Sequence, residues 1–412
     1  MSLRNKYFYG YYIVAAGFII QGAYIAAMFT YGVFFNELQT QFGWSRAMIA
    51  GASSLAFLVM GLAGVMAGRM NDWIGPRIII VLGGISAGFG YLLMSRVQTP
   101  WQLYLFYGVL VGMGFSTHDV ITLSTVARWF VKRRGAMSGI VKVGTGCGQL
   151  LGPLGATALI AAYGWRAAYL FIAGVLSVTL LAVAQVMRRD PQDLGMFADG
   201  DPEPAANSGA GHAQQGVSFR NAIRRGQFWT ICLAECAIFF CLLTMIVHIV
   251  PHAIDLGLGP VTAAAVLSTI GGASILGRIV MGMVHDRIGG KRSLYVCFAA
   301  LISSLVWLLV AAEGWMLFVF AVIYGFAHGG FFTVMSPTVA ELFGTGSHGL
   351  LFGMVLFSGT IGGALGPILA GAAFDATGSY RIVFIIFTLV AVGGLILTTR
   401  LRPLSETRDK RE

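Results

Sequence analysis

The chain of 412 residues is poor in charged side chains, proline and cysteine. Asp, Glu, Lys and Arg make up 11% of it, whereas soluble proteins carry roughly 25%. This scarcity excludes a soluble enzyme, a nucleic-acid-binding protein and a disordered chain. The five cysteines all lie in apolar stretches, which excludes a disulfide scaffold and favours packing roles. No Cys/His metal spacing occurs, and we expect neither a metal nor a cofactor.

Apolar residues dominate instead, at 57% of the chain. Because a helix needs about 20 apolar residues to cross a bilayer, charge and turn signals divide the sequence into twelve candidate spans. They are 10–35, 46–68, 77–95, 101–127, 135–162, 166–188, 228–254, 261–285, 292–312, 315–342, 348–374 and 380–400. The predicted fold class is therefore an all-α membrane protein with twelve transmembrane helices in two six-helix bundles. Gly-rich runs such as 144–148 lie inside apolar helices, which favours close helix packing over phosphate binding.

The distribution of basic residues predicts the orientation. With the N-terminus in the cytoplasm, 21 of the 27 Lys and Arg residues lie on the cytoplasmic side and four on the other. This split follows the positive-inside rule and places both termini in the cytoplasm. The formal net charge of +10 is then a topology signal rather than a nucleic-acid surface.

A change of composition separates the two predicted bundles. Residues 190–217 are rich in Pro, Gly, Ala, Asp and Gln, which is typical of a flexible cytoplasmic linker. We expect an N-terminal bundle over 1–189 and a C-terminal bundle over 218–412. The second begins with a short interfacial helix at 218–227.

One motif, G-x-x-x-D-x-x-G-x-[RK], occurs after the second span of each half. Its first copy contains Gly68, Asp72, Gly75 and Arg77, and its second contains Gly282, Asp286, Gly289 and Lys291. We expect each Asp at the start of a tight loop, where it caps a helix N-terminus or pairs with a basic residue of the neighbouring bundle. Two copies at matching positions indicate an internal repeat, which is typical of transporters with a midplane substrate site. The pattern resembles the major facilitator superfamily over essentially the whole chain.

A narrower resemblance follows the fourth span. The run from Arg128 to Gly139 (RWFVKRRGAMSG) and the Gln-Phe-Trp at 227–229 are similar to motifs of monocarboxylate transporters and of oxalate:formate-type antiporters. The short loops resemble those of a prokaryotic member. This resemblance implies a carrier of small organic anions.

Four ionisable residues lie deep within the predicted spans. At 1.5 Å per residue, Asp119, Lys142 and Arg278 lie about 12 Å from the cytoplasmic edge, and Glu235 about 15 Å. A charge in a span costs at least about 2.5 kcal/mol on insertion scales, so each is a functional candidate. Their equal depth permits pairing but does not identify which helices face each other.

The resemblance implies that Arg278 binds the substrate carboxylate, which its planar guanidinium suits. The alternative is a structural ion pair with Asp119 or Glu235. Asp119 is a candidate proton carrier that takes up a proton when an anion neutralises Arg278, its expected partner, and the alternative is a permanent salt bridge. His118 beside it is either a proton shuttle or a packed histidine.

The remaining candidates have two open interpretations each. Lys142 either binds substrate from a polar face shared with Thr145 or extends toward the cytoplasm. Glu235 is either a second proton site or a paired structural acid. His328, Phe331 and Phe332 either shape the apolar part of the substrate site or pack in the core.

The chain departs from the family pattern at three positions. Ser274 replaces an Asp of the animal members, Phe29 replaces a Lys in the first span, and Val355 replaces a Lys of the oxalate antiporters. The missing cations make a dianion a poorer substrate than a monoanion. Proton coupling must then use other acids, with Asp119 and Glu235 as candidates.

We therefore expect a symporter of a proton and a small monocarboxylate such as lactate or pyruvate. It would work by alternating access, as a monomer in the lipid bilayer of the cell membrane, with no nucleic-acid partner. The alternatives are an anion exchanger, a drug exporter and a membrane sensor, and an enzyme is the least favoured class.

Overall fold

The computed structural model describes residues 8–201 and 216–402, and these residues form helices and no strand. The described chain contains eleven helices that are long and apolar enough to cross a membrane. Residue contacts divide it into two compact units, which are treated separately below. The first contains Met1–Lys132, Ile140–Gln215 and Thr345–Gly353, and the second contains Arg133–Gly139, Gly216–Gly344 and Met354–Glu412.

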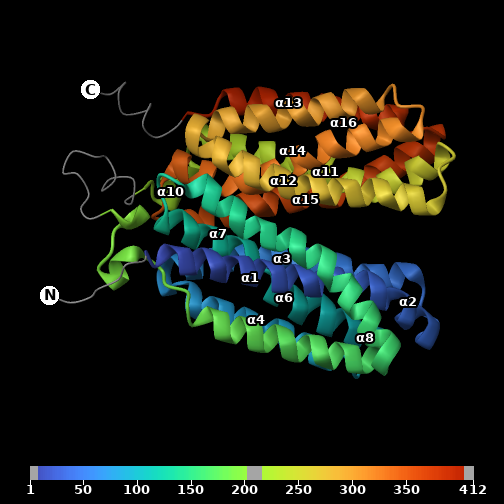
Figure 1. Cartoon of the computed structure of the whole chain (residues 1–412), viewed down its shortest axis with the longest axis horizontal. Coiled ribbons are helices and arrows are strands. Elements are labelled where there is room, and N and C mark those ends of the chain that lie inside the picture. The colour runs from blue at the N-terminus through green and yellow to red at the C-terminus, as the bar shows by residue number, and fades with distance from the viewer. Residues whose placement is uncertain (1–7, 202–215, 403–412) are drawn as a thin grey trace. The chain divides into compact units, whose positions relative to one another are not determined.

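Figure 1 shows the longer helices of the first unit. The helical segments of this unit are α1 (Gly10–Phe29), α2 (Tyr31–Phe42), α3 (Arg46–Ile74), α4 (Pro76–Met94), α5 (Pro100–Leu103), the π-helix η1 (Tyr104–Val111), α6 (Gly112–Phe115), α7 (His118–Trp129) and most of α8 (Arg134–Ala184). Pro76 and Pro100 stand at helix starts, where the missing N–H has no intrahelical acceptor. The predicted span 101–127 thus consists of four consecutive helical segments.

α8 is 51 residues long and contains a break at Gly164, whose φ is 79° and ψ 160°. Glycine tolerates this positive φ, which a side chain would oppose. The break lies between the predicted spans 135–162 and 166–188. α8 thus has two arms.

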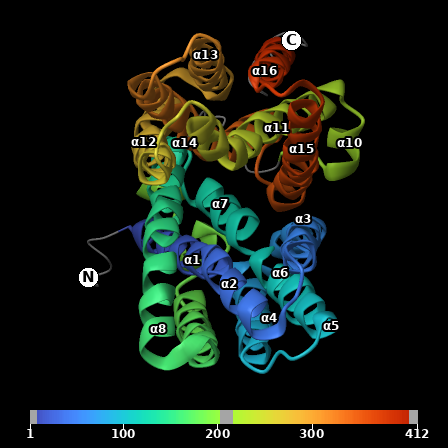
Figure 2. The same ribbon diagram turned by 90° about the vertical axis from the view of Figure 1, so that its right-hand side faces the viewer.

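Glycines let α1 and the first arm of α8 approach closely, and Figure 2 shows the two helices side by side. Added Cβ atoms at Gly144, Gly148 and Gly152 would collide with backbone carbonyls of Phe18, Gly22 and Ala26. A glycine every fourth residue forms one bare helix face, which permits this packing in an apolar medium.

The described part of the predicted linker packs on the first unit. It contains two short 3-10 helices, Pro191–Leu194 and Ala198–Gly200. Asp199 Oδ2 accepts hydrogen bonds from the backbone N–H groups of Val131 (3.0 Å) and Lys132 (2.9 Å). Lys132 also donates to Asp201 at 2.7 Å, and this contact raises the pKa of its amine. The rest of the predicted linker, 202–215, lies outside the described residues.

The second unit contains α10 (Phe219–Ile223), α11 (Gly226–Asp255), α12 (Pro260–Ile288), α13 (Gly290–Leu308), α14 (Gly314–Phe343), most of α15 (His348–Thr377) and α16 (Arg381–Thr399). α14 packs against both α12 and α13. An added Cβ at Gly277 would collide with the carbonyl of Phe326, and one at Gly329 with that of Ser274. Both units therefore use glycines to bring the backbones of adjacent helices into close contact.

Candidate functional site

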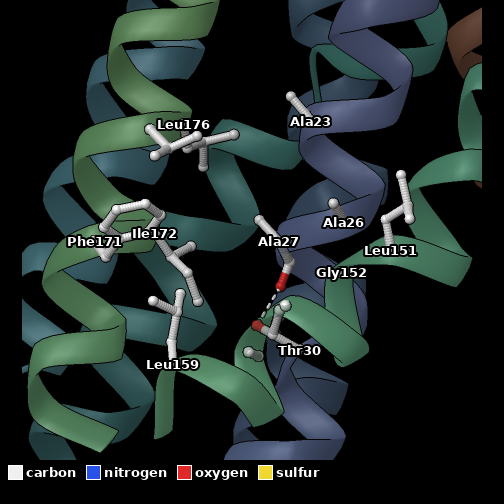
Figure 3. A pocket seen from close by; sticks show the side chains of 13 residues that line it. Ala23, Ala26, Ala27, Thr30, Leu151, Gly152, Leu159, Phe171, Ile172 and Leu176 are labelled. Atoms are coloured by element: carbon white, nitrogen blue, oxygen red, sulfur yellow. Dashed lines mark hydrogen bonds between the residues drawn. The ribbon is translucent and has the colours of Figure 1, made fainter. Parts of the chain in front are cut away.

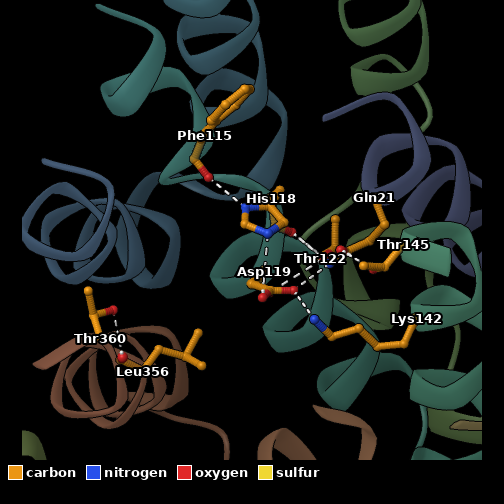
Figure 4. A network of polar contacts seen from close by, with 9 residues as sticks. All are labelled: Gln21, Phe115, His118, Asp119, Thr122, Lys142, Thr145, Leu356 and Thr360. Carbon is orange, nitrogen blue, oxygen red and sulfur yellow. Dashed lines mark hydrogen bonds and ion pairs between the residues drawn. The ribbon is translucent and has the colours of Figure 1, made fainter. Parts of the chain in front are cut away.

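The first unit contains a buried ion pair, shown in Figure 4. Lys142 Nζ, on α8, donates to Asp119 Oδ1, on α7. The Lys142 side chain is 3% exposed and the Asp119 side chain 15%, so the carboxylate is the more accessible partner. This geometry does not fit the interpretation of Lys142 as a side chain extended toward the cytoplasm. Within its own unit, the cationic partner of Asp119 is Lys142.

α7 begins at His118, so Asp119 lies in the first turn of a helix. The unpaired N–H groups of a first turn favour a negative charge there. His118 Nδ1 lies 2.6 Å from the carbonyl of Phe115, and its Nε2 lies 3.5 Å from Asp119 Oδ2. The imidazole thus connects the second carboxylate oxygen to the preceding segment of the chain.

Gln21, on α1, completes this network and was not among the candidates from the sequence. Its Nε2 donates to Asp119 Oδ1 at 2.8 Å and to Thr122 Oγ1 at 2.9 Å. Its Oε1 accepts from Thr145 Oγ1 at 2.9 Å. The available signal was an amide residue in the middle of an otherwise apolar first span. The shared face of Lys142 and Thr145 contacts this network.

Arg278 lies on α12 in the second unit and is 2% exposed. The close approach of α14 fixes the backbone of Arg278, since an added Cβ at Gly329 would lie 3.0 Å from the backbone nitrogen of Arg278. Gly139, which belongs to the same unit, would place a Cβ 2.5 Å from the Arg278 carbonyl. Two glycines therefore enclose the turn that holds the guanidinium-bearing residue.

Glu235, on α11, is 2% exposed and packs on α15, where a Cβ at Gly359 would lie 3.0 Å from its Cγ. The neighbouring Ser358 donates to the carbonyl of Cys232 at 2.9 Å. Glu235 is thus a buried acid at a helix-packing surface. Its position fits the interpretation as a structural acid better than that of an accessible proton site.

The aromatic candidates of α14 face different neighbours. Phe331 is 2% exposed and packs edge-on against Phe298 of α13, with ring centroids 4.9 Å apart. Phe332 is half-buried and lies 5.0 Å from the His328 ring and 5.1 Å from Phe239 of α11. Phe331 is therefore placed as a core residue, and the group of Phe332, His328 and Phe239 is the more accessible one.

The first G-x-x-x-D motif forms a helix cap. Asp72 accepts hydrogen bonds from the backbone N–H groups of Gly349 and Leu350, both at 2.9 Å, at the start of α15. Its Oδ1 also lies 2.5 Å from Arg128 Nη2, on a side chain that is 6% exposed. Gly68 makes room for this contact, since an added Cβ would collide with the Gly349 carbonyl.

The second motif forms a similar cap. Asp286 accepts from the N–H groups of Gly135 (2.6 Å) and Ala136 (2.8 Å), at the start of α8. Gly282 again removes a steric conflict, because its added Cβ would lie 2.5 Å from the Gly135 carbonyl. Buried His285 beside Asp286 lies 3.3 Å from Glu341 Oε1.

The sequence-based expectation that each Asp begins a loop was wrong. Both lie in the last turns of helices, because α3 continues to Ile74 and α12 to Ile288. The loops are single glycines, Gly75 with φ 93° and Gly289 with φ 79°. These positive φ values require glycine and turn the chain directly into the next helix.

The final basic residues of the two motifs bind within their own units. Arg77 donates to Gln185, and Lys291 donates to the carbonyl of Thr399 at 2.8 Å. Arg77 therefore joins α4 to the residue that follows α8, and Lys291 joins α13 to the end of α16.

An apolar cavity of about 200 Å³ lies between α1 and the two arms of α8 (Figure 3). Its lining includes Ala23, Ala26, Gly155, Leu159 and Phe171, and none of its residues is ionisable. Its one hydroxyl, on Thr30, donates to the Ala27 carbonyl at 2.7 Å. The cavity is thus separate from the charged candidates, and its lining offers nothing that recognises an anion.

The chain belongs to the Major Facilitator Superfamily, whose family model matches residues 17–312 and 273–412. It is 29% identical to monocarboxylate transporter 13 of Rattus norvegicus over 395 residues, which cover 95% of this chain and 89% of that protein. It is 27% identical to monocarboxylate transporter 12 of Homo sapiens, covering 96% and 82% of the two chains. The crystal structure of the human organic anion transporter MFSD10 is similar in fold, with a TM-score of 0.71, 14% identity and coverage of 94% and 99%. The protein is thus a membrane transporter and not an enzyme.

Proposed function

We propose that the protein is a symporter that carries a small monocarboxylate together with a proton. The observation that carries this proposal is the buried pair of Asp119 and Lys142 in the first unit. The relatives named monocarboxylate transporters support the choice of a small carboxylate as substrate. Lactate and pyruvate are the substrates to test first.

The pair provides a physical reason for coupling. A proton on Asp119 removes the counter-charge of Lys142, whose side chain is 3% exposed. An uncompensated buried cation is costly, so the protonated carrier favours an anion. Conversely, an anion near Lys142 lowers the cost of protonating Asp119. Proton and carboxylate thus bind together, which is the requirement for symport.

Arg278 is the proposed residue for binding the carboxylate. A guanidinium keeps its charge at any physiological pH and offers two parallel N–H donors to a carboxylate. Its burial to 2% exposure strengthens such a contact relative to one in water. Phe332 and His328 are proposed to contact the apolar part of the substrate. Glu235 and His118 remain secondary candidates for carrying the proton.

We also propose that the chain crosses the membrane twelve times and that both termini lie in the cytoplasm. The membrane is proposed to be the cell membrane. The 51 residues of α8 are long enough for two crossings, and Gly164 supplies the turn between its arms. The bias of Lys and Arg supports the orientation. One chain contains both units, so we propose that the monomer is functional.

The two Asp caps are the proposed cytoplasmic gate. Asp72 holds the start of α15 and Asp286 the start of α8 through backbone N–H groups. Such caps contribute about 0.5–2 kcal/mol each, which is small enough to break and re-form during a transport cycle. Alternating access would then release and restore them.

The test is uptake of radiolabelled L-lactate into proteoliposomes, with and without an inward proton gradient. Gradient-driven accumulation supports symport. Uptake that ignores the gradient but is stimulated by an anion inside the vesicle indicates an anion exchanger instead. Empty liposomes, which contain no carrier, are one control. Arg278→Lys protein, which lacks the bidentate carboxylate contact, is the other.

A further inference from the structure

The side-chain amide of Gln21 makes hydrogen bonds through both its nitrogen and its oxygen. Its side chain is fully buried. Nε2 lies 2.8 Å from Asp119 Oδ1, 2.9 Å from Thr122 Oγ1 and 3.2 Å from the His118 carbonyl. Because a carboxylate and a carbonyl only accept hydrogen bonds, the NH2 end of the amide must face α7. The amide oxygen then faces the Thr145 hydroxyl on α8.

The two oxygens of Asp119 therefore differ. Oδ1 receives hydrogen bonds from both Lys142 and Gln21, whereas Oδ2 faces His118 Nε2 at 3.5 Å. Donors directed at a carboxylate favour its charged form. When Lys142 turns toward an anion, Gln21 is still in place as a donor to Oδ1.

We propose that Gln21 is a positioning residue that sets the pH at which Asp119 takes up its proton. This inference rests on the proposed role of Asp119 as the proton carrier. Gln21 also ties α1 to both helices of the ion pair, since Thr145 lies three residues from Lys142 on the same face of α8. It thereby holds Asp119 and α8 in register while the pair opens. Among the described residues of the unit, the titratable groups that contact Asp119 are Lys142 on α8 and His118 on α7.

The first experiment compares the pH profile of L-lactate uptake in wild-type and Gln21→Met proteoliposomes. Methionine keeps the length and helix propensity of glutamine but donates no hydrogen bond. One hydrogen bond to a charged group corresponds to about a tenfold change in protonation, so the midpoint should move up by about one pH unit. Gln21→Glu, which is isosteric, should move it further in the same direction, because a second carboxylate opposes ionisation of Asp119.

Ser86→Ala is the matched control, because it removes one hydrogen bond of the same unit, from Ser86 Oγ to the Leu110 carbonyl, away from Asp119. It should leave the midpoint unchanged. A purely structural role for Gln21 would reduce the amount of active protein without moving the midpoint. An unmoved midpoint in both Gln21 variants overturns the proposal.

A second readout separates this inference from the symport proposal. In Lys142→Met protein, infrared titration of the Asp119 carboxylic acid band reports protonation without any transport. The band is assigned by its loss in Lys142→Met/Asp119→Asn protein. Adding Gln21→Met should raise the midpoint of this titration by about one unit. If it does so while wild-type uptake ignores the proton gradient, the positioning role stands and symport fails. If the midpoint does not move, the role assigned to Gln21 is wrong.

Discussion

Lys142→Met should destabilise the first unit, and Lys142→Met/Asp119→Asn should restore most of the loss. Removing one member of a buried ion pair leaves the other charged and uncompensated, at a cost of about 3–5 kcal/mol. The Asp119 side chain keeps 15% of its surface exposed, which solvates part of the remaining charge. We therefore expect the lower end of that range, about 3 kcal/mol.

The double variant removes both charges and keeps the hydrogen bond from Gln21, because an Asn oxygen also accepts from that amide. Replacing a whole buried pair by neutral groups is often close to neutral in stability. The double variant should therefore unfold within about 1 kcal/mol of wild type, while each single variant unfolds well below it.

Thermal unfolding in one detergent, followed by tryptophan fluorescence, measures this difference. Trp129 is fully buried in the same unit and reports its unfolding. About 3 kcal/mol corresponds to a midpoint roughly 6–12 °C lower, by the scaling for domains of 150–250 residues. A Lys142→Met protein that melts with wild type, or a double variant no more stable than the singles, would refute the assignment of the pair.

Three further predictions follow from the two units. Arg278→Lys should abolish lactate uptake while the protein elutes from gel filtration as wild type does, because an ammonium cannot make the bidentate contact. Normal uptake would contradict the proposed bidentate binding of the carboxylate by Arg278. Asp72→Asn should lower the melting midpoint, because it loses the ion pair with Arg128 and weakens the cap on α15. A variant that melts with wild type would contradict the role given to this contact. Gly329→Ala should lower the free energy of unfolding by about 1–3 kcal/mol through overpacking, whereas Gly271→Ala should not, because an added Cβ there meets nothing within 4 Å. Thermal melting of the purified variants distinguishes them. A neutral Gly329→Ala would mean that α14 shifts freely.

The all-helical fold could be predicted because it depends on the length of the apolar runs and on the charged and turn-forming residues that separate them. The break at Gly164 falls between two predicted spans, and the glycine run of 144–148 serves helix packing, as expected. The number of crossings is less determined, since the described chain has eleven candidate helices and one of them is twice the usual length. The ends of α3 and α12 were placed too early, because polar residues at a membrane surface still continue a helix.

The candidate site was predictable in its chemistry but not in its partners. Hydropathy identifies Asp119 and Lys142 as costly charges at one depth, yet only the packing of α7 on α8 shows that they pair. Gln21 is neutral, so its insertion cost gave no comparable signal. Phe331 and Phe332 are adjacent in sequence, and their different neighbours depend on the rotation of α14.

The central claim is that protonation of Asp119 couples the proton gradient to carboxylate movement. Its most direct test compares two activities of Asp119→Asn in the same proteoliposomes. Asparagine mimics the protonated acid, so lactate exchange across the membrane, which moves no net proton, should persist. Accumulation of lactate driven by an inward proton gradient should be lost. Accumulation by Asp119→Asn at the wild-type level would contradict the claim.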